Sequence, residues 1–218
     1  MRVILLDNRD SFVYNLVDQF AVLGAGIEVY RNTVPAARVL KALEPTREES
    51  AHGERPVLAL SPGPGHPRTS GCLMELVITA LADSIPTLGI CLGFQAIVEA
   101  CGGDVDRVGP VHGRSVRVAL TEAGRADAAF AVLQGEPLDV ARYHSLGTRE
   151  LPPTLTCLAR TIEMDGGASS WPPATPRPRW SACSSTPSPC SPPTVRGFCA
   201  PSPTTSLPPA PERPEPRP

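Results

Sequence analysis

The chain has 218 residues, a hydrophobic content of 41% and a formal net charge of −2. This length and apolar content suffice for one large domain or two small ones, each with a buried core. A charge so close to zero argues against nucleic acid or an anionic membrane surface as a partner. No segment has the apolar length of a membrane span, and no signal-peptide pattern precedes the first apolar run, so we expect a cytoplasmic protein.

Up to about residue 161, short apolar runs alternate with helical segments, which is typical of a mostly parallel α/β sheet flanked by helices. The predicted strands of the first part are 3–6, 28–31, 57–60 and 86–90. The predicted helices are 11–20, capped by Ser11, then 36–43, a segment ending near 82, and 94–100. Residues 46–55 are charged and lack periodicity, which indicates an irregular surface insertion. The strands predicted at 116–120, 140–143 and 155–159 would extend the sheet in antiparallel fashion.

The composition changes abruptly from about Asp165. Sixteen of the 27 prolines lie in the last 54 residues, together with abundant serine and both tryptophans. Such a sequence cannot bury enough apolar surface to offset the entropy lost on ordering. We therefore predict a domain over 1–161 and a disordered tail over 162–218.

The segment Gly89–Gly93, Gly-Ile-Cys-Leu-Gly, lies between a predicted buried strand and a predicted helix. Its two glycines permit a sharp turn, and a nucleophile at a strand–turn–helix junction forms a nucleophile elbow. Cys91 would lie at the helix N-terminus, where backbone N–H groups and the helix dipole favour a thiolate. We interpret Cys91 as a nucleophile; the alternative is a buried structural cysteine.

We assign no catalytic or metal-binding role to the other cysteines or to the acidic residues near the N-terminus. Seven cysteines, an odd number, without a CxxC pair or zinc spacing, argue against a disulfide framework and predict no metal site. Asp7 and Asp10 could suggest a metal site, but both precede the first predicted helix, where carboxylates cap N–H groups. Cys72, Cys101 and Cys157 are interpreted as packing residues.

Four segments together resemble the class I glutamine amidotransferases, in particular the anthranilate synthase component II branch of that family. They are Asp-Asn-Arg-Asp-Ser-Phe-Val-Tyr-Asn-Leu at 7–16, Leu-Ser-Pro-Gly-Pro-Gly-His-Pro at 60–67, Gly-Ile-Cys-Leu-Gly-Phe-Gln at 89–95, and Arg-Tyr-His-Ser-Leu at 142–146. A lone GxCxG pattern is weak, but four segments in the family's order and spacing are specific. The resemblance covers about residues 1–161.

The resemblance implies a glutaminase reaction centred on Cys91, which would attack the glutamine carboxamide and form a thioester. The thioester-forming intermediate carries an oxyanion, which the Leu92 N–H and an N–H of the turn Gly63-Pro64-Gly65 would hold. Because proline has no N–H, Gly63 is the better donor of the turn.

The resemblance also assigns the substrate contacts and the partner. Gln95 would contact glutamine, and the backbone at Ser145 and Leu146 would hold its amino-acid end. The ammonia would pass to a chorismate-using synthase subunit, component I, in a hetero-oligomer, and no cofactor is implied. The aminodeoxychorismate synthase glutaminase of the folate pathway shares these motifs and is the alternative.

The family also has a late G-x-Q-F-H-P-E-S segment that supplies the histidine base and its glutamate, and this chain lacks it. No Pro-Glu follows any of its four histidines, which are His52, His66, His112 and His144. His144 lies in the stretch assigned to substrate support, so we do not interpret it as the base. His112 is interpreted as a loop or partner-contact residue, and His52 and His66 as surface residues.

A shifted reading frame recovers the missing segment. Codons permitted for residues 180–192, read from the third base, encode Val-Gly-Val-Gln-Phe-His-Pro-Glu-Ser-Val-Leu-Thr. The histidine codon straddles Ser185 and Thr186, and the glutamate codon straddles Pro187 and Ser188. We infer a frameshift between about Thr161 and Ala168, so that this chain would be catalytically impaired.

Two other functions compete with this interpretation. A non-catalytic module could dock on a synthase subunit and use its proline-rich tail for other contacts. A cysteine hydrolase of another amidotransferase-like type, such as a peptidase, would share the elbow. The Ser-Pro-Gly-Pro-Gly and Arg-Tyr-His-Ser-Leu segments favour glutamine chemistry over the peptidase.

Overall fold

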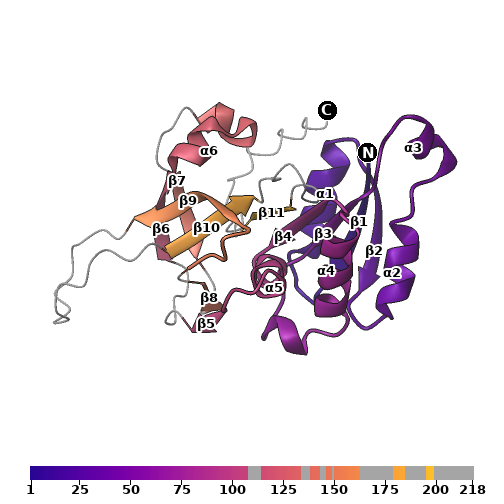
Figure 1. Cartoon of the computed structure of the whole chain (residues 1–218), viewed down its shortest axis with the longest axis horizontal. Helices are drawn as coiled ribbons and strands as arrows, with labels where there is room; N and C mark the ends of the chain where they lie inside the picture. Colours follow the sequence, from indigo (N-terminus) through magenta and orange to yellow (C-terminus); the bar gives the residue numbers. More distant parts are fainter. Residues whose placement is uncertain are drawn as a thin grey trace, which may run out of the picture.

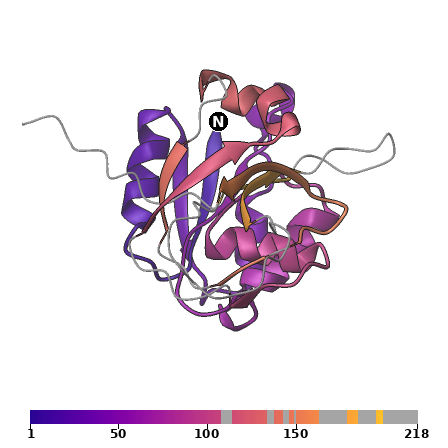
Figure 2. The same ribbon diagram turned by 90° about the vertical axis from the view of Figure 1, so that its left-hand side faces the viewer.

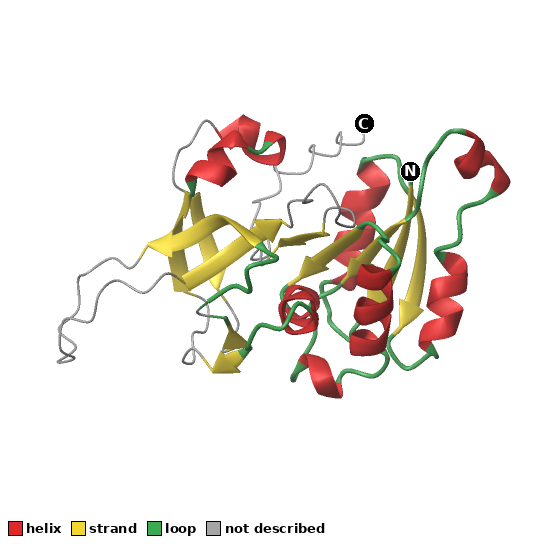
Figure 3. Cartoon of the chain, in the orientation of Figure 1, coloured by secondary structure: helices red, strands yellow, loops and turns green. Residues whose placement is uncertain are grey.

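A computed structural model describes residues 1–107, 114–133, 138–142, 146–148, 150–162, 179–184 and 195–198. These residues form a nine-stranded mixed sheet with flanking helices and a separate two-stranded sheet (Figures 1 and 3). The large sheet has a parallel half, built by the first part of the chain, and an antiparallel half, built by the later part.

The parallel half contains β1 (Arg2–Asp7), β2 (Gly26–Arg31), β3 (Val57–Leu60) and β4 (Thr87–Ile90), in the order β2-β1-β3-β4. The four strands confirm the predictions for this part of the chain within one or two residues at each end. In β1, Val3 to Leu6 are fully buried. A continuous apolar run of this kind is expected of a parallel strand that is covered on both faces.

Helices cover both faces of the parallel half. Residues Val3 and Leu5 of β1 pack against α1 (Val13–Val22). Their neighbours Ile4 and Leu6 point the other way, toward α2 (Ala36–Ala42), α4 (Leu73–Ala82) and α5 (Leu92–Ala100). The parallel half is therefore a three-layer arrangement with one core on each side of the sheet.

Two local predictions for this half were wrong. Helix α1 begins at Val13 and has no side-chain cap from Ser11; instead, the Phe12 N–H donates to Asp10 Oδ1 at 2.8 Å. The expected irregular insertion contains a helix, α3 (Arg47–Ala51). Thr46 and Glu49 form a capping box there, in which the Glu49 N–H donates to Thr46 Oγ1 at 3.1 Å and the Thr46 N–H donates to Glu49 Oε2 at 2.8 Å.

The predicted antiparallel extension is confirmed. It consists of β6 (Arg114–Leu120), β7 (Leu138–Arg142) and β9 (Thr156–Ile162), and it faces the viewer in Figure 2. Helix α6 (Glu122–Ala126) and the 3₁₀ helix η2 (Ala128–Leu133) lie between β6 and β7 in the chain. A separate apolar cluster lies here, formed by Val118, Leu120, Phe130, Leu158 and Ala159. The short strands β5 (Asp106–Arg107) and β8 (Leu146–Gly147) pair with each other.

Two strands join the halves, and both come from the segment where we expected no regular structure. β10 (Arg179–Ser184) pairs with β9, and β11 (Val195–Phe198) lies between β10 and β4, so the full order is β2-β1-β3-β4-β11-β10-β9-β6-β7. Strand pairing uses backbone groups, so the edges of β4 and β9 can accept a strand of almost any composition. The remainder of 163–218 lies outside the described residues.

The directions of these two strands decide which one approaches the elbow. β11 is parallel to β4, and its last residue, Phe198, pairs with Ile90. β10 is antiparallel to β11, and its last residue, Ser184, pairs with Arg196, near the amino end of β4. β11 and not β10 therefore ends beside Ile90, the residue before Cys91.

Candidate active site

Cys91 occupies a single-residue turn between β4, which ends at Ile90, and α5, which begins at Leu92 (Figure 1). Its φ of 51° and ψ of −104° are unusual for a residue with a side chain. Such backbone strain costs about 1–3 kcal/mol and is concentrated at active sites. The first-turn N–H groups of α5 stand next to this position, where they can stabilise negative charge. The structure thus forms the predicted sharp turn between strand and helix, with Cys91 at the turn.

The two glycines of the elbow allow close packing that no side chain would permit. A Cβ on Gly93 would lie 2.5 Å from both Cβ and O of Leu60 in β3. A Cβ on Gly89 would lie 2.7 Å from the backbone of Gly93 and from Ile97 Cδ1. The start of α5 therefore lies directly against β3 and β4, which fixes the position of Cys91 relative to the sheet.

The turn after β3 lies beside the elbow. A Cβ on Gly63 would lie 2.7 Å from Leu92 Cδ2, so the turn backbone touches the residue that follows Cys91. Pro64 and Gly65 are exposed, and Gly65 has a φ of 82°. Of the two turn glycines predicted for oxyanion binding, Gly63 lies against Leu92, whereas a Cβ on Gly65 would be near Thr69 Oγ1.

Gln95 connects the elbow helix to a distant part of the chain. Its side chain is 4% exposed, and Nε2 donates to the Leu146 carbonyl oxygen at 3.2 Å. Leu146 belongs to β8, so two predicted substrate-contact residues far apart in the sequence are adjacent in space. Ser145 lies outside the described residues.

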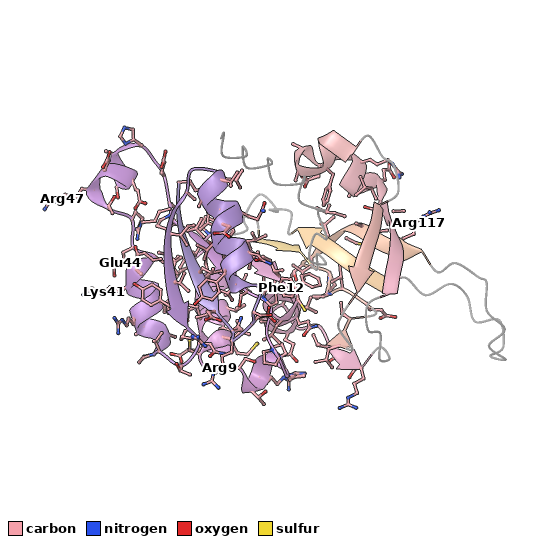
Figure 4. The ribbon with its side chains drawn as sticks, turned by 180° about the vertical axis from the view of Figure 1, so that it is seen from behind. Arg9, Phe12, Lys41, Glu44, Arg47 and Arg117 are labelled. Atoms are coloured by element: carbon pink, nitrogen blue, oxygen red, sulfur yellow. The ribbon has the colours of Figure 1, made fainter. Side chains whose placement is uncertain are left out.

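Asp7, the last residue of β1, is a local hydrogen-bond acceptor. Asp7 Oδ1 accepts the Arg9 N–H at 2.7 Å, and Asp7 Oδ2 lies 2.9 Å from Arg31 Nε. Arg9 and Phe12, labelled in Figure 4, belong to the loop between β1 and α1. Within the described part of the chain, no group of three or more His, Cys, Asp or Glu residues could hold a metal ion.

Asn8 joins the site although the sequence interpretation did not select it. It is 1% exposed, its Nδ2 donates to the Ser61 carbonyl oxygen at 3.0 Å, and its backbone lies against Gly63. The signal for it in the sequence is its place directly after a buried strand.

The described histidines lie away from the elbow. His52 is exposed at the end of α3, where Nδ1 lies 2.9 Å from the Glu48 carbonyl oxygen. His66 Nε2 lies 3.6 Å from Glu99 Oε1, which also accepts Arg68 Nε at 3.1 Å. Because α5 rises about 1.5 Å per residue, Glu99 is about 12 Å along the helix from Cys91. His112 and His144 lie outside the described residues.

The remaining described cysteines have a different environment. Burial raises the pKa of the thiols of Cys72, Cys101 and Cys157. Cys72 and Cys101 belong to or pack against the main core. These thiols are therefore kept protonated, as expected of packing residues. Among the described residues, no helix is long and apolar enough to cross a membrane.

The chain belongs to the class I glutamine amidotransferase family, because the family model matches residues 4–165. Among curated relatives, anthranilate synthase component 2 of Corynebacterium glutamicum is 44% identical over 156 residues, which cover 66% of this chain and 69% of that protein. Anthranilate synthase component 2 of Vibrio parahaemolyticus is 43% identical over 158 residues, which cover 72% of this chain and 74% of that protein. The resemblance to this family that the four sequence segments indicated is thereby confirmed.

Solved structures agree on the fold. The crystal structure of a glutamine amidotransferase from Thermotoga maritima superposes with a TM-score of 0.58 at 17% identity, covering 91% of this chain and 74% of that chain. At this identity the likeness concerns the fold alone, and it confirms the predicted α/β class.

Proposed function

We propose that the chain is the glutaminase subunit of an anthranilate synthase, acting in the cytoplasm in a hetero-oligomer with a chorismate-using component I. The observation that carries this proposal is the elbow: Cys91 is strained between β4 and α5, and the Gly63 turn packs against the next residue, Leu92. A strained nucleophile beside two backbone N–H groups fits the cleavage of a carboxamide.

In the proposed reaction, the Cys91 thiolate forms a bond from Sγ to the carboxamide carbon of glutamine. The carbonyl electron pair moves onto oxygen, where the N–H groups of Leu92 and Gly63 stabilise it. The carbon–nitrogen bond then breaks, and ammonia leaves with an added proton. Water hydrolyses the thioester to glutamate.

The proposed substrate contacts are Gln95, Ser145 and Leu146. The hydrogen bond from Gln95 to the Leu146 carbonyl oxygen supports this assignment, because it holds β8 beside the elbow helix. A fixed amino-acid end would align the carboxamide with Cys91 and reduce the entropy lost in reaching the transition state.

The reaction also needs a group that gives ammonia its proton, and we propose that a frameshift removed it from this chain. Losing a general base costs ~10²–10⁴ in rate. Members of a catalytic triad act as a unit, so the loss could reach ~10⁶. The chain as it stands should therefore be a very poor glutaminase.

The names of the relatives support the choice of partner. Both relatives described above are component 2 of anthranilate synthase, at 43–44% identity. The four sequence segments alone left the aminodeoxychorismate synthase partner open as the alternative. We therefore prefer the partner that makes anthranilate for tryptophan synthesis.

A glutaminase assay on three purified proteins tests the proposal. They are the 218-residue chain, a version with the reading frame restored between 161 and 168, and that version carrying Cys91→Ala. We expect turnover only in the restored protein without the substitution. Turnover by the original chain would disprove the catalytic loss. An inactive restored protein that still co-purifies with component I would favour the non-catalytic module.

A further inference from the structure

Asn8 is a buried polar residue whose hydrogen bonds are incomplete. It directly follows β1 at the sheet edge where the elbow lies, and it is 1% exposed. Its Oδ1 atom is buried and, within the described part of the structure, has no hydrogen-bond partner. Unpaired buried acceptors are uncommon in folded proteins, and each calls for an explanation.

The paired groups of Asn8 hold the strand end that leads into the oxyanion turn. The Asn8 N–H donates to Ser61 Oγ at 2.9 Å, and Asn8 Nδ2 donates to the Ser61 carbonyl oxygen at 3.0 Å. The Ser61 hydroxyl in turn donates to the Pro62 carbonyl oxygen at 2.7 Å. Three hydrogen bonds thus fix the two residues that precede Gly63.

Asn8 also forms one wall against which Gly63 rests. A Cβ on Gly63 would lie 2.6 Å from Asn8 Cβ and 2.7 Å from the Asn8 carbonyl oxygen. Leu92 is also in contact with Gly63, because its Cδ2 would be 2.7 Å from the same Cβ. Gly63 is therefore packed against both Asn8 and the residue whose N–H is the other proposed oxyanion donor.

We propose that Asn8 is a positioning residue, which orients the peptide N–H of Gly63 toward the oxygen that becomes charged when Cys91 attacks. Oxyanion donors act only when they are aimed in advance, and a misplacement of about 1 Å can cost roughly 10²-fold in rate. The inference rests on the proposed glutamine chemistry at Cys91.

The chain offers a matched control at Asn32. Asn32 follows β2 as Asn8 follows β1, it is buried, and its Nδ2 donates to the Ser70 carbonyl oxygen at 3.3 Å. Its backbone lies against Gly71, because a Cβ there would clash with the Asn32 carbonyl group. Asn32 thus shares with Asn8 the side-chain bond to a serine carbonyl oxygen and the close approach to a glycine, but that glycine is Gly71 and not Gly63.

The test measures covalent labelling of Cys91 in the purified 218-residue chain, which needs no catalytic base. The probe is a chloromethyl ketone analogue of L-glutamine, with its D-enantiomer and iodoacetamide as comparisons. With the ketone, negative charge builds on the ketone oxygen as the thiolate reacts. Cys91 Sγ ends bonded to the chloromethyl carbon, and the carbon–chlorine bond breaks to release chloride. Iodoacetamide loses iodide by direct displacement and places no charge on an oxyanion site.

We expect Asn8→Asp to slow the maximal labelling rate by the L-ketone roughly 10-fold or more, because the carboxylate repels the Ser61 carbonyl oxygen and releases the turn. The half-saturating ketone concentration and the iodoacetamide rate should stay within about twofold. Asn32→Asp should leave all three quantities within the same margin. Ser61→Ala, a milder change, should slow the ketone in the same selective way if Asn8→Asp does not fold.

Equal slowing of ketone and iodoacetamide by Asn8→Asp, or equal effects of Asn8→Asp and Asn32→Asp, would overturn the positioning role. An unchanged ketone rate in both Asn8→Asp and Ser61→Ala would overturn it as well. If the original chain shows no preference for the L-ketone over the D-ketone, the proposed glutamine chemistry fails, and the inference fails with it.

Discussion

Gly93→Ala is the sharpest test of how the elbow is packed. The added Cβ would lie 2.5 Å from Cβ and O of Leu60, whereas ordinary contact begins at 3.4 Å, so α5 would have to move away from β3 by about 0.9 Å. Leu60 is fully buried and its carbonyl is part of the sheet, so neither atom can give way alone. Overpacking of this kind costs about 1–3 kcal/mol and sometimes more. The gain in helix propensity offsets at most about 1 kcal/mol.

We therefore expect Gly93→Ala to lose about 2 kcal/mol of unfolding free energy. For a chain of this size, that loss lowers the Tm by roughly 4–8 °C. Urea unfolding and thermal melts measure the change. The control is Gly26→Ala in β2, where a Cβ meets nothing within 4 Å; this substitution should be neutral or stabilising by up to about 1 kcal/mol. Equal stability of the two variants would refute the reasoning about elbow packing.

Two further predictions concern ionisation and backbone strain. The Arg2 side chain and the capping box lower the pKa of Glu49 to about 2, from an ordinary 4.5. A lowered pKa stabilises the fold above the ordinary value, so this stabilisation should be lost as the pH falls from 4.5 toward 2. Glu49→Gln should flatten the dependence of the unfolding free energy on pH in that window, which urea unfolding at several pH values measures. An unchanged slope of unfolding free energy against pH would contradict the lowered pKa of Glu49. Cys91→Gly should raise the unfolding free energy by about 1 kcal/mol, because glycine relieves the strain at φ 51°. Thiol labelling at this position should disappear in the same variant. A variant less stable than the original chain would show that the turn stores no strain.

The sequence predicted those features that depend on neighbouring residues. The elbow around Cys91 follows from a strand, two glycines and a helix in direct succession, and the buried strands follow from apolar runs. Helix α3 was missed although Thr46 and Glu49 have capping-box spacing, because its five residues show no periodicity. The Thr46–Glu49 spacing by itself indicates the start of a helix.

Contacts between distant residues could not be predicted in the same way. The Gln95–Leu146 bond spans 51 positions and the Asn8–Ser61 bonds span 53, and no local pattern links these pairs. The strands β10 and β11 were missed for a different reason. Their composition indicates no core, but the backbone edges of β4 and β9 supply the pairing partners.

The position of β11 has a consequence for the cooperativity of unfolding. Within the described sheet, this strand of four residues is what connects the ladder of β4 to the ladder of β10. The two sides have separate apolar clusters, one around Leu6 and Leu76 and another around Val118 and Leu158. Proteins open in contiguous cooperative units, and a short strand between separate cores can form the boundary between two such units. In hydrogen exchange, we expect amides of β6 and β9 to exchange through a lower-energy opening than those of β1 and β3, so that the sheet opens in two stages rather than as one unit.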